Sequence, residues 1–280
     1  MADSWEWDET LYAGSARYYA AGRLPYPADL GQRIAGAARL NGHELALDVG
    51  CGPGSLTLLL APHVREIVGI DPDAGMLEQA AATARRASVG NASWRQMRAE
   101  DLPADLRGVE LVTFAQSFHW MQRARVARTV WQMLVPDGRC VHVHATTHRG
   151  DGSDDALPRP RPPYEQIDAL VRACLGAERR PGRSSLPHGT AGGENEVYRA
   201  AGFDGPTHVE VERGEVIERP VDDIVAATFS LSSSTPHLFG VRRAAFEAEL
   251  GAMLTAAADD GRFCERVRDL AFDVWWARTR

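Results

Sequence analysis

Residues 47–55 read Leu47-Asp48-Val49-Gly50-Cys51-Gly52-Pro53-Gly54-Ser55, an apolar run that ends in a glycine cluster and continues into a helical pattern. Glycine has no Cβ, so such a loop can turn tightly and approach a ligand closely. The N-terminus of the following helix offers free N–H groups to that ligand. The spacing is G-x-G-x-G, which differs from the dinucleotide pattern G-x-G-x-x-G because Ser55 stands five positions after Gly50. The segment therefore predicts a strand, a ligand-binding turn and a helix.

Outward from this turn, apolar runs alternate with helical spacing. The runs predict strands at residues 44–49, 65–70, 93–97, 110–115 and 139–144, with a turn at 136–138, and the helical spacing predicts helices at 55–61, 75–87 and 123–134. Strands that alternate with helices at this spacing indicate βαβ units. The fold class is therefore α/β, with a doubly wound parallel sheet.

The second half of the chain has a less regular pattern. Helices are expected at 164–175, 194–201, 221–229 and 241–257, strands at 207–213 and 271–277, and loops at 150–163 and 179–193. Loops of this length in a compact domain are typically functional lids or irregular segments.

Polar residues follow the predicted strands in order. Asp71 ends the second strand, Glu100 and Asp101 follow the third, and Gln116 and His119 follow the fourth. In an open α/β sheet, ligands bind beyond the carboxyl ends of the strands. An acidic group at the end of the second strand, twenty-one residues after Gly50, suits the two hydroxyls of a ribose.

This assembly resembles the class I S-adenosylmethionine-dependent methyltransferases over Leu45 to His144. Within that superfamily it is similar to the small-molecule branch that includes trans-aconitate methyltransferases. The branch's Y-x-x-x-R-P-x-Y-P segment is matched from Tyr19 to Pro27, with Leu24 in place of its first proline, and its His-Trp pair is matched at His119. The resemblance implies a Rossmann-like seven-stranded sheet with helical lid and cap insertions. It divides the chain into lid helices (1–40), a cofactor-binding core (41–148), and cap insertions with the remaining core helix and strands (149–280).

The resemblance also implies site roles for S-adenosylmethionine. Gly50, Gly52 and Gly54 would cradle the methionine part, and Asp71 would hold the ribose. Glu100 and the Asp101 backbone would hold adenine, with Met76 near the ring, and Gln116 would lie beside the methionine amine and the sulfonium. The N-terminal segment makes Tyr19 and Arg23 candidates for the methionine carboxylate, to which a guanidinium binds bidentately.

Composition limits the alternatives. The chain of 280 residues has 38 acidic and 31 basic side chains, all of the latter arginine, for a net charge of −7. Without lysine, Schiff-base enzymes and P-loop NTPases are excluded. The negative charge favours a small acceptor over nucleic acid. No apolar run has the ~20 residues of a membrane helix, the acidic stretch 1–10 is unlike a leader, and four dispersed cysteines suggest no disulfide framework. A cytoplasmic protein is expected.

For methyl transfer, the protein must chiefly align the acceptor with the sulfonium methyl and exclude water. His119 is the candidate base, since histidine titrates near neutrality, although it can equally form a pocket wall. The histidines at 142, 144 and 148 allow a metal interpretation, but strand histidines facing a pocket are preferred and no metal is assigned. Tyr164, His188, Tyr198 and His237 are further candidates for substrate contact.

Three functions remain open at this stage. The first is methyl transfer to a small-molecule acceptor in specialised metabolism, with oxygen, nitrogen or carbon as the accepting atom. The second is an NAD-linked oxidoreductase, which the G-x-G-x-G spacing disfavours. The third is a non-catalytic protein that binds S-adenosylmethionine.

Overall fold

The apolar run before the glycine cluster is a central strand of a seven-stranded sheet. The computed structural model describes residues 8–176 and 192–277. The strands are β1 (Leu45–Val49), β2 (Glu66–Asp71), β3 (Ala92–Gln96), β4 (Val109–Ala115), β5 (Leu134–His144), β6 (Phe203–Val211) and β9 (Leu270–Ala277), in the order β3-β2-β1-β4-β5-β9-β6. β1 to β5 pair in parallel, and β9 runs antiparallel between β5 and β6. The predicted Rossmann-like, seven-stranded α/β fold is confirmed.

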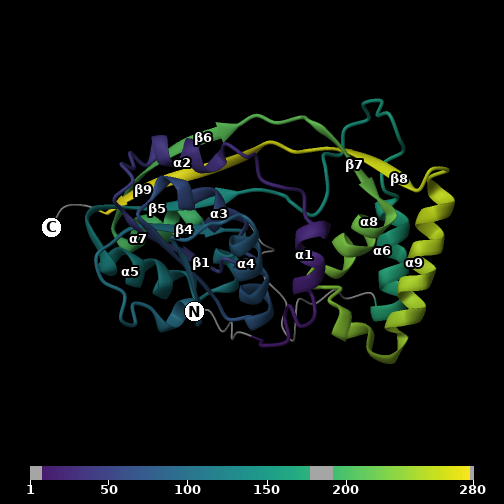
Figure 1. Cartoon of the computed structure of the whole chain (residues 1–280), viewed down its shortest axis with the longest axis horizontal. Coiled ribbons are helices and arrows are strands. Elements are labelled where there is room, and N and C mark those ends of the chain that lie inside the picture. Colours follow the sequence, from purple (N-terminus) through teal and green to yellow (C-terminus); the bar gives the residue numbers. More distant parts are fainter. Residues whose placement is uncertain (1–7, 177–191, 278–280) are drawn as a thin grey trace.

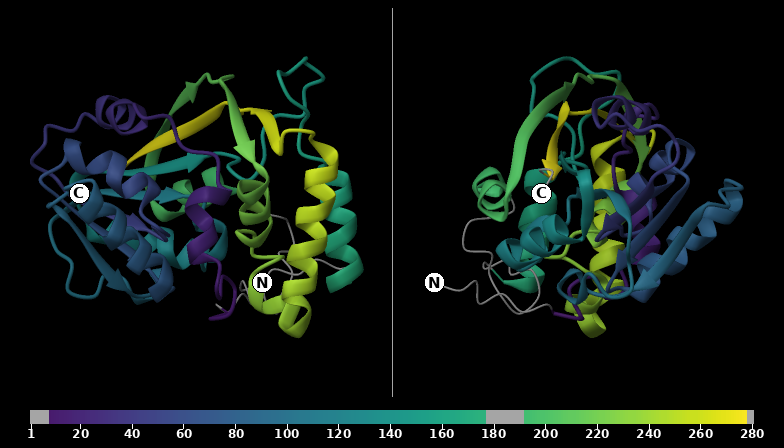
Figure 2. Two further views of the ribbon diagram at one scale, coloured as in Figure 1. Left: turned by 45° about the vertical axis from the view of Figure 1, so that its right-hand side comes forward. Right: turned by 90° about the vertical axis from the view of Figure 1, so that its left-hand side faces the viewer.

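Helices cover both faces of this sheet (Figures 1 and 2). On one face, α2 (Leu30–Ala37) and α3 (Ser55–Leu60) bury their apolar side chains against the sheet. On the other, α5 (Arg123–Met133) and α7 (Glu194–Ala201) do so. β1 contributes to both clusters, because successive strand residues point to opposite faces: Ala46 packs on one side and Leu47 on the other. Helix α4 (Ala74–Arg86) packs on β2 and β3.

A third hydrophobic cluster forms a cap at one end of the molecule. The cap consists of α6 (Tyr164–Leu175), α8 (Val221–Phe229), α9 (Arg243–Ala257) and the two-stranded sheet of β7 (Val216–Pro220) and β8 (Arg262–Arg266). Figure 1 shows α1 (Ala16–Gly22) between the cap and the core sheet, and the β6–β7 and β8–β9 segments running from one to the other. The cap is thus joined to β6, the strand at one edge of the core sheet, and to the neighbouring strand β9.

Most predicted elements agree with the observed ones. The helices expected at 164–175, 194–201 and 221–229 have those bounds in the structure. The helix expected from 241 begins at Arg243, because residues 236–242 form a 3₁₀ helix. The predicted loop at 150–163 is confirmed, whereas most of the loop expected at 179–193 lies outside the described residues, as do residues 1–7.

Two predictions of secondary structure were incomplete. β7 and β8 were not predicted, because each has only five residues and polar side chains interrupt its apolar pattern. The turn expected at 136–138 lies inside β5 as a local irregularity: the pairing of β5 with β4 shifts register there, and Asp137 takes a φ of 60°. The turn residues therefore distort the strand without ending it. No helix among the described residues has the length and apolarity to cross a membrane.

Candidate functional site

The glycine turn is built for close backbone approach. Gly50, Gly52 and Gly54 all have positive φ, at 68°, 53° and 82°. A Cβ on Gly50 would lie 2.5 Å from the Ser117 Cβ, and a Cβ on Gly54 would lie 2.8 Å from the Trp94 ring. A Cβ on Gly52 would meet nothing within 4 Å. Two of the glycines therefore permit packing within the protein, and Gly52 leaves open space beside the turn.

Asp71 connects the end of β2 to this turn. Its Oδ2 accepts a 2.9 Å hydrogen bond from the Gly52 N–H, and its Oδ1 accepts one of 2.9 Å from the Asp73 N–H. The side chain is buried, and burial raises its pKa to about 6, although the two backbone hydrogen bonds act in the opposite direction. The carboxylate is fixed in place before any ligand binds.

Asp48 is a functional candidate that the sequence analysis missed. Its carboxylate is buried under the turn and accepts hydrogen bonds from the Thr57 hydroxyl at 2.6 Å and the Thr113 hydroxyl at 2.8 Å. Burial raises its pKa. An acidic residue inside an otherwise apolar strand was the available signal, because a buried carboxylate requires hydrogen-bond partners.

A cavity of about 340 Å³ lies at the carboxyl ends of β1, β2 and β4. Eight of the predicted cofactor residues line it: Tyr19, Arg23, Gly50, Gly52, Asp71, Met76, Glu100 and Gln116. Gly54 and Asp101 do not line it. Gly54 is the N-cap of α3 and packs on Trp94, and the Asp101 side chain is exposed and accepts a 3.4 Å hydrogen bond from the Arg98 N–H.

Glu100 forms a wall of this cavity and also supports it. Its Oε1 accepts a 2.9 Å hydrogen bond from the Gln122 N–H, at the start of α5, and its Oε2 lies 3.4 Å from the Arg98 Nε. Met76 is buried in the first turn of α4. A carboxylate and an apolar side chain therefore both line this cavity.

Helix α1 and the residue that follows it, Arg23, also contribute to the lining of this cavity. The Arg23 guanidinium stacks over the Tyr19 ring, with its Cζ 4.7 Å from the ring centroid, and its Nη2 donates to the Ser230 carbonyl at 2.7 Å. The buried Arg23 Nε has no hydrogen-bond partner among the described residues. A guanidinium with a free N–H at the cavity wall suits an anionic ligand group.

A second cavity, of about 650 Å³, adjoins the first. Five residues line both: Tyr12, Tyr19, Arg23, Gln116 and Trp120. Four histidines also line the second cavity: His119, His142, His144 and His148. Two adjoining cavities with a common wall can hold two ligands side by side.

Comparisons with known proteins agree with this geometry. The family model described as "Methyltransferase domain" matches residues 46–138. Residues 46–138 are thus similar to a methyltransferase domain. The match implies S-adenosylmethionine as the methyl donor.

Curated proteins described as methyltransferases match part of this chain. An uncharacterised methyltransferase of Mycobacterium tuberculosis is 34% identical over 135 residues, which cover 47% of this chain and 51% of that protein. A probable S-adenosylmethionine-dependent methyltransferase of Saccharomyces cerevisiae, CRG1, is 33% identical over 95 residues, covering 33% of this chain and 32% of the yeast protein. The chain thus spans about half the length, or less, of these curated relatives.

Solved structures share the fold over most of the chain. A putative type II methyltransferase from Anaeromyxobacter dehalogenans has a TM-score of 0.51 and 22% identity, covering 92% of this chain and 97% of its own. The [4+2]-cyclase SpnF has a TM-score of 0.50 and 19% identity, covering 99% and 86%. At these identities the likeness establishes the fold alone.

Three of the histidines that line the second cavity are held neutral by burial. Burial lowers the pKa of His119 to about 4, and the Arg123 guanidinium acts in the same direction. Burial likewise lowers the pKa of His142 to about 3 and that of His148 to about 4. A neutral imidazole can donate a hydrogen bond through one ring nitrogen and accept a hydrogen bond through the other.

Asp273 organises two further imidazoles and was also missed. Its Oδ2 lies 3.0 Å from the His144 Nε2, and its Oδ1 lies 2.6 Å from the His208 Nδ1. Asp273 is buried on β9, opposite His142 on β5. Only tertiary structure brings these strands together, so no local signal existed. The described part of the chain contains no group of three His, Cys, Asp or Glu residues arranged to hold a metal.

The other candidates for substrate contact lie elsewhere. Tyr198 is fully buried in the core, where it stacks on Phe118, so its expected contact with substrate is wrong for this structure. Tyr164 donates to Glu265 within the cap, and His237 contacts Thr235. His188 lies outside the described residues.

Proposed function

We propose that this protein transfers the methyl group of S-adenosylmethionine to a small-molecule acceptor. The observation that carries the proposal is the common wall of the two cavities. The smaller cavity contains the glycine turn and Asp71, and the larger one contains the histidines. A cofactor in the first and an acceptor in the second would meet at the wall that Gln116 and Trp120 share.

In this proposal the donor supplies a methyl group already activated by a sulfonium. Asp71 accepts the ribose hydroxyls, Glu100 lies at the adenine, and Arg23 binds the carboxylate with Tyr19 beside it. Gly52 leaves space for the methionine part, because a Cβ built on this residue would have no other atom within 4 Å. Gln116, which has a φ of 58°, projects at the end of β4 beside the reacting centre. The protein's contribution is alignment and exclusion of water.

The acceptor side of the proposal rests on the second cavity. His119 stays the predicted base, and His144, linked to Asp273, is a second imidazole on the same cavity. We further propose a small acceptor of specialised metabolism and kinship with the trans-aconitate branch, which the Tyr19–Pro27 segment supports. Leu231 and Ser232, which follow the cap helix α8, line the second cavity, and the net charge of −7 disfavours nucleic acid as the acceptor.

Calorimetry of the intact protein with S-adenosylmethionine and with NAD⁺ tests the cofactor assignment. Binding of the sulfonium cofactor alone is expected, and preference for NAD⁺ would overturn it. One structural neighbour is a [4+2]-cyclase, so turnover needs a separate measurement. Formation of S-adenosylhomocysteine with a panel of phenols, amines and carboxylic acids is expected, whereas tight cofactor binding without turnover, or turnover on RNA alone, would contradict the small-acceptor proposal.

A further inference from the structure

A buried ion pair joins the two strands of the cap's small sheet. The Arg219 Nη1 on β7 donates to the Glu265 Oε2 on β8 at 2.7 Å, and each residue is only 2% exposed. Two charges removed from water are costly unless additional hydrogen bonds satisfy their remaining groups. The partners of the other atoms of this pair therefore show what it is built to hold.

The Nη2 atom of Arg219 donates hydrogen bonds to the ends of two helices. Nη2 donates to the Gly22 carbonyl at the end of α1, at 2.9 Å, and to the Asp223 carbonyl at the start of α8, at 3.0 Å. Its distance to the Ala21 carbonyl is 3.5 Å. A planar guanidinium makes such contacts in a fixed geometry, which a flexible ammonium does not. Arg219 thus fixes the position of the residue immediately before Arg23.

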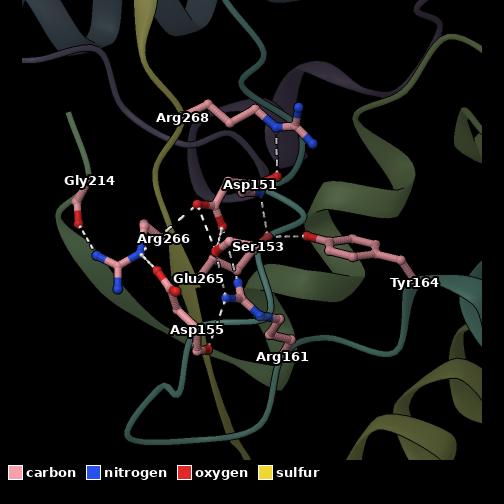
Figure 3. Close-up of polar contacts among 10 residues, drawn as sticks. Asp151, Ser153, Asp155, Arg161, Tyr164, Gly214, Glu265, Arg266 and Arg268 are labelled. Carbon is pink, nitrogen blue, oxygen red and sulfur yellow. Dashed lines mark hydrogen bonds and ion pairs between the residues drawn. The ribbon is translucent and has the colours of Figure 1, made fainter. Parts of the chain in front are cut away.

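The Oε1 atom of Glu265 accepts hydrogen bonds from the loop after β5 and from the start of α6. Oε1 accepts from the Gly150 N–H at 2.6 Å and from the Tyr164 hydroxyl at 2.6 Å. Burial, with the carboxylate beside it, raises the pKa of Tyr164, so the hydroxyl stays protonated and remains a donor. Figure 3 shows Tyr164 pointing to Glu265, with Arg266 and Asp151 on neighbouring positions of the same network.

The end of α1 is pressed against α8 at this point. A Cβ on Gly22 would lie 2.5 Å from the Ala226 carbonyl oxygen, so only glycine permits this approach. At the other end of the helix, the Ser15 hydroxyl donates to the Phe229 carbonyl at 2.8 Å. Helix α1 is therefore fastened to α8 at both ends, and Arg23 leaves it directly after the Arg219 contact.

We propose that Arg219 and Glu265 are positioning residues that hold Arg23 toward the carboxylate of the cofactor. The inference rests on the proposed function, which gives Arg23 that ligand. Neither Arg219 nor Glu265 lines either cavity, so their effect is transmitted through Gly22. The pair fixes the backbone from which the Arg23 side chain extends over Tyr19.

The test compares two thioether ligands that differ only in the amino-acid part. S-adenosylhomocysteine carries the carboxylate, whereas 5′-methylthioadenosine keeps the adenosine and lacks it. Calorimetry of Glu265→Gln is expected to show about tenfold or greater loss of affinity for S-adenosylhomocysteine and affinity for methylthioadenosine within about twofold of the unmodified protein. The glutamine keeps an acceptor for Tyr164 and Gly150 and removes the charge that orients Arg219.

Two further variants keep the test decisive. Gly22→Ala should give the same selective loss by displacing α1 without touching the ion pair. Arg266 is the neighbour of Glu265 on β8, and its side chain contacts Gly214 and Asp155. Arg266→Gln should therefore change the affinity for neither ligand. Equal loss of both ligands, or unchanged affinity for S-adenosylhomocysteine, would overturn the inference. If the unmodified protein bound neither ligand, the proposed function itself would fail and the inference would fall with it.

Discussion

The Gly52 N–H donates a 2.9 Å hydrogen bond to the Asp71 Oδ2, which joins the glycine turn after β1 to the end of β2. The ribose-binding candidate is thereby held by the same loop that leaves space for the methionine part. Because the remaining Asp71 contact is to the Asp73 N–H, both oxygens are oriented by backbone groups. The carboxylate is preorganised, and its loss has a predictable effect on ligand affinity.

Asp71→Asn is expected to weaken S-adenosylmethionine binding by about 10- to 100-fold. A hydrogen bond to a charged group contributes about 1.5–3 kcal/mol to binding. In addition, the side-chain NH₂ of asparagine can face the Gly52 N–H, which is also a donor. Calorimetric titration measures the effect. Asp101→Asn is the matched control, because that carboxylate is exposed and lies outside the cavity. Unchanged affinity in Asp71→Asn would contradict the ribose assignment.

The affinity for the cofactor should fall as the pH drops below about 6. Burial raises the Asp71 pKa from 3.8 to about 6, and the ionised form is the one that accepts two ribose hydroxyls. The sign for stability is opposite: a raised pKa means that the folded state holds the proton more tightly. The contribution of Asp71 to stability is therefore present below pH 3.8 and lost as the pH rises through 6. Titrations between pH 5 and pH 8 (about one decade of affinity per unit below the pKa) check the first effect, and Asp71→Asn should abolish it.

The positions of these residues could be predicted because they follow strands in sequence order. Gly50, Asp71, Glu100 and Gln116 each stand at a strand's carboxyl end, and parallel strands bring those ends to one edge. Asp273 could not be found in this way. It reaches the second cavity's histidines only because β9 inserts antiparallel between β5 and β6.

The same distinction explains the cap. The helices α6 and α8 were predicted with correct bounds, and α9 begins two residues later than the predicted 241. Arg219 on β7 and Glu265 on β8 are 46 positions apart in the sequence, and the pairing of the two strands brings them together. Each strand alone has too little apolar pattern to indicate burial, so a buried ion pair was not expected there.

Acid should destabilise the protein through its buried histidines. Burial lowers the pKa of His142 from 6.5 to about 3, so the unfolded chain takes up a proton that the folded state refuses. Its contribution to stability is present above pH 6.5 and is lost as the pH falls toward the folded-state value. Between pH 7.5 and pH 5 the loss from this residue is about 2 kcal/mol.

Urea unfolding of His142→Phe checks this prediction. The variant should lose about 2 kcal/mol less stability than the unmodified protein over the same pH interval. His43→Phe removes an exposed imidazole and serves as the control. Identical pH dependence in His142→Phe and the unmodified protein would show that His142 is not buried in its neutral form.

Replacement of His119 by alanine should lower turnover while leaving cofactor affinity nearly intact. The residue lines the acceptor cavity and not the cofactor cavity, and general base catalysis contributes about 10²–10⁴-fold. Initial rates at saturating S-adenosylmethionine, with an acceptor found by screening, measure the effect. His144→Gln is the informative comparison, because that imidazole carries the Asp273 contact. A full effect in His144→Gln with none in His119→Ala would transfer the base role to His144.

Glu265→Ala should be the most destabilising of these changes. It leaves the Arg219 guanidinium buried without its counter-charge and removes the acceptor of Tyr164 and Gly150. Breaking one partner of a buried ion pair costs about 3–5 kcal/mol, whereas an exposed pair contributes about 0–1 kcal/mol. Asp105→Ala, which removes an exposed partner of Arg95, is therefore the control. Chemical denaturation of both variants tests the difference, and comparable losses would mean that water reaches the Arg219 site.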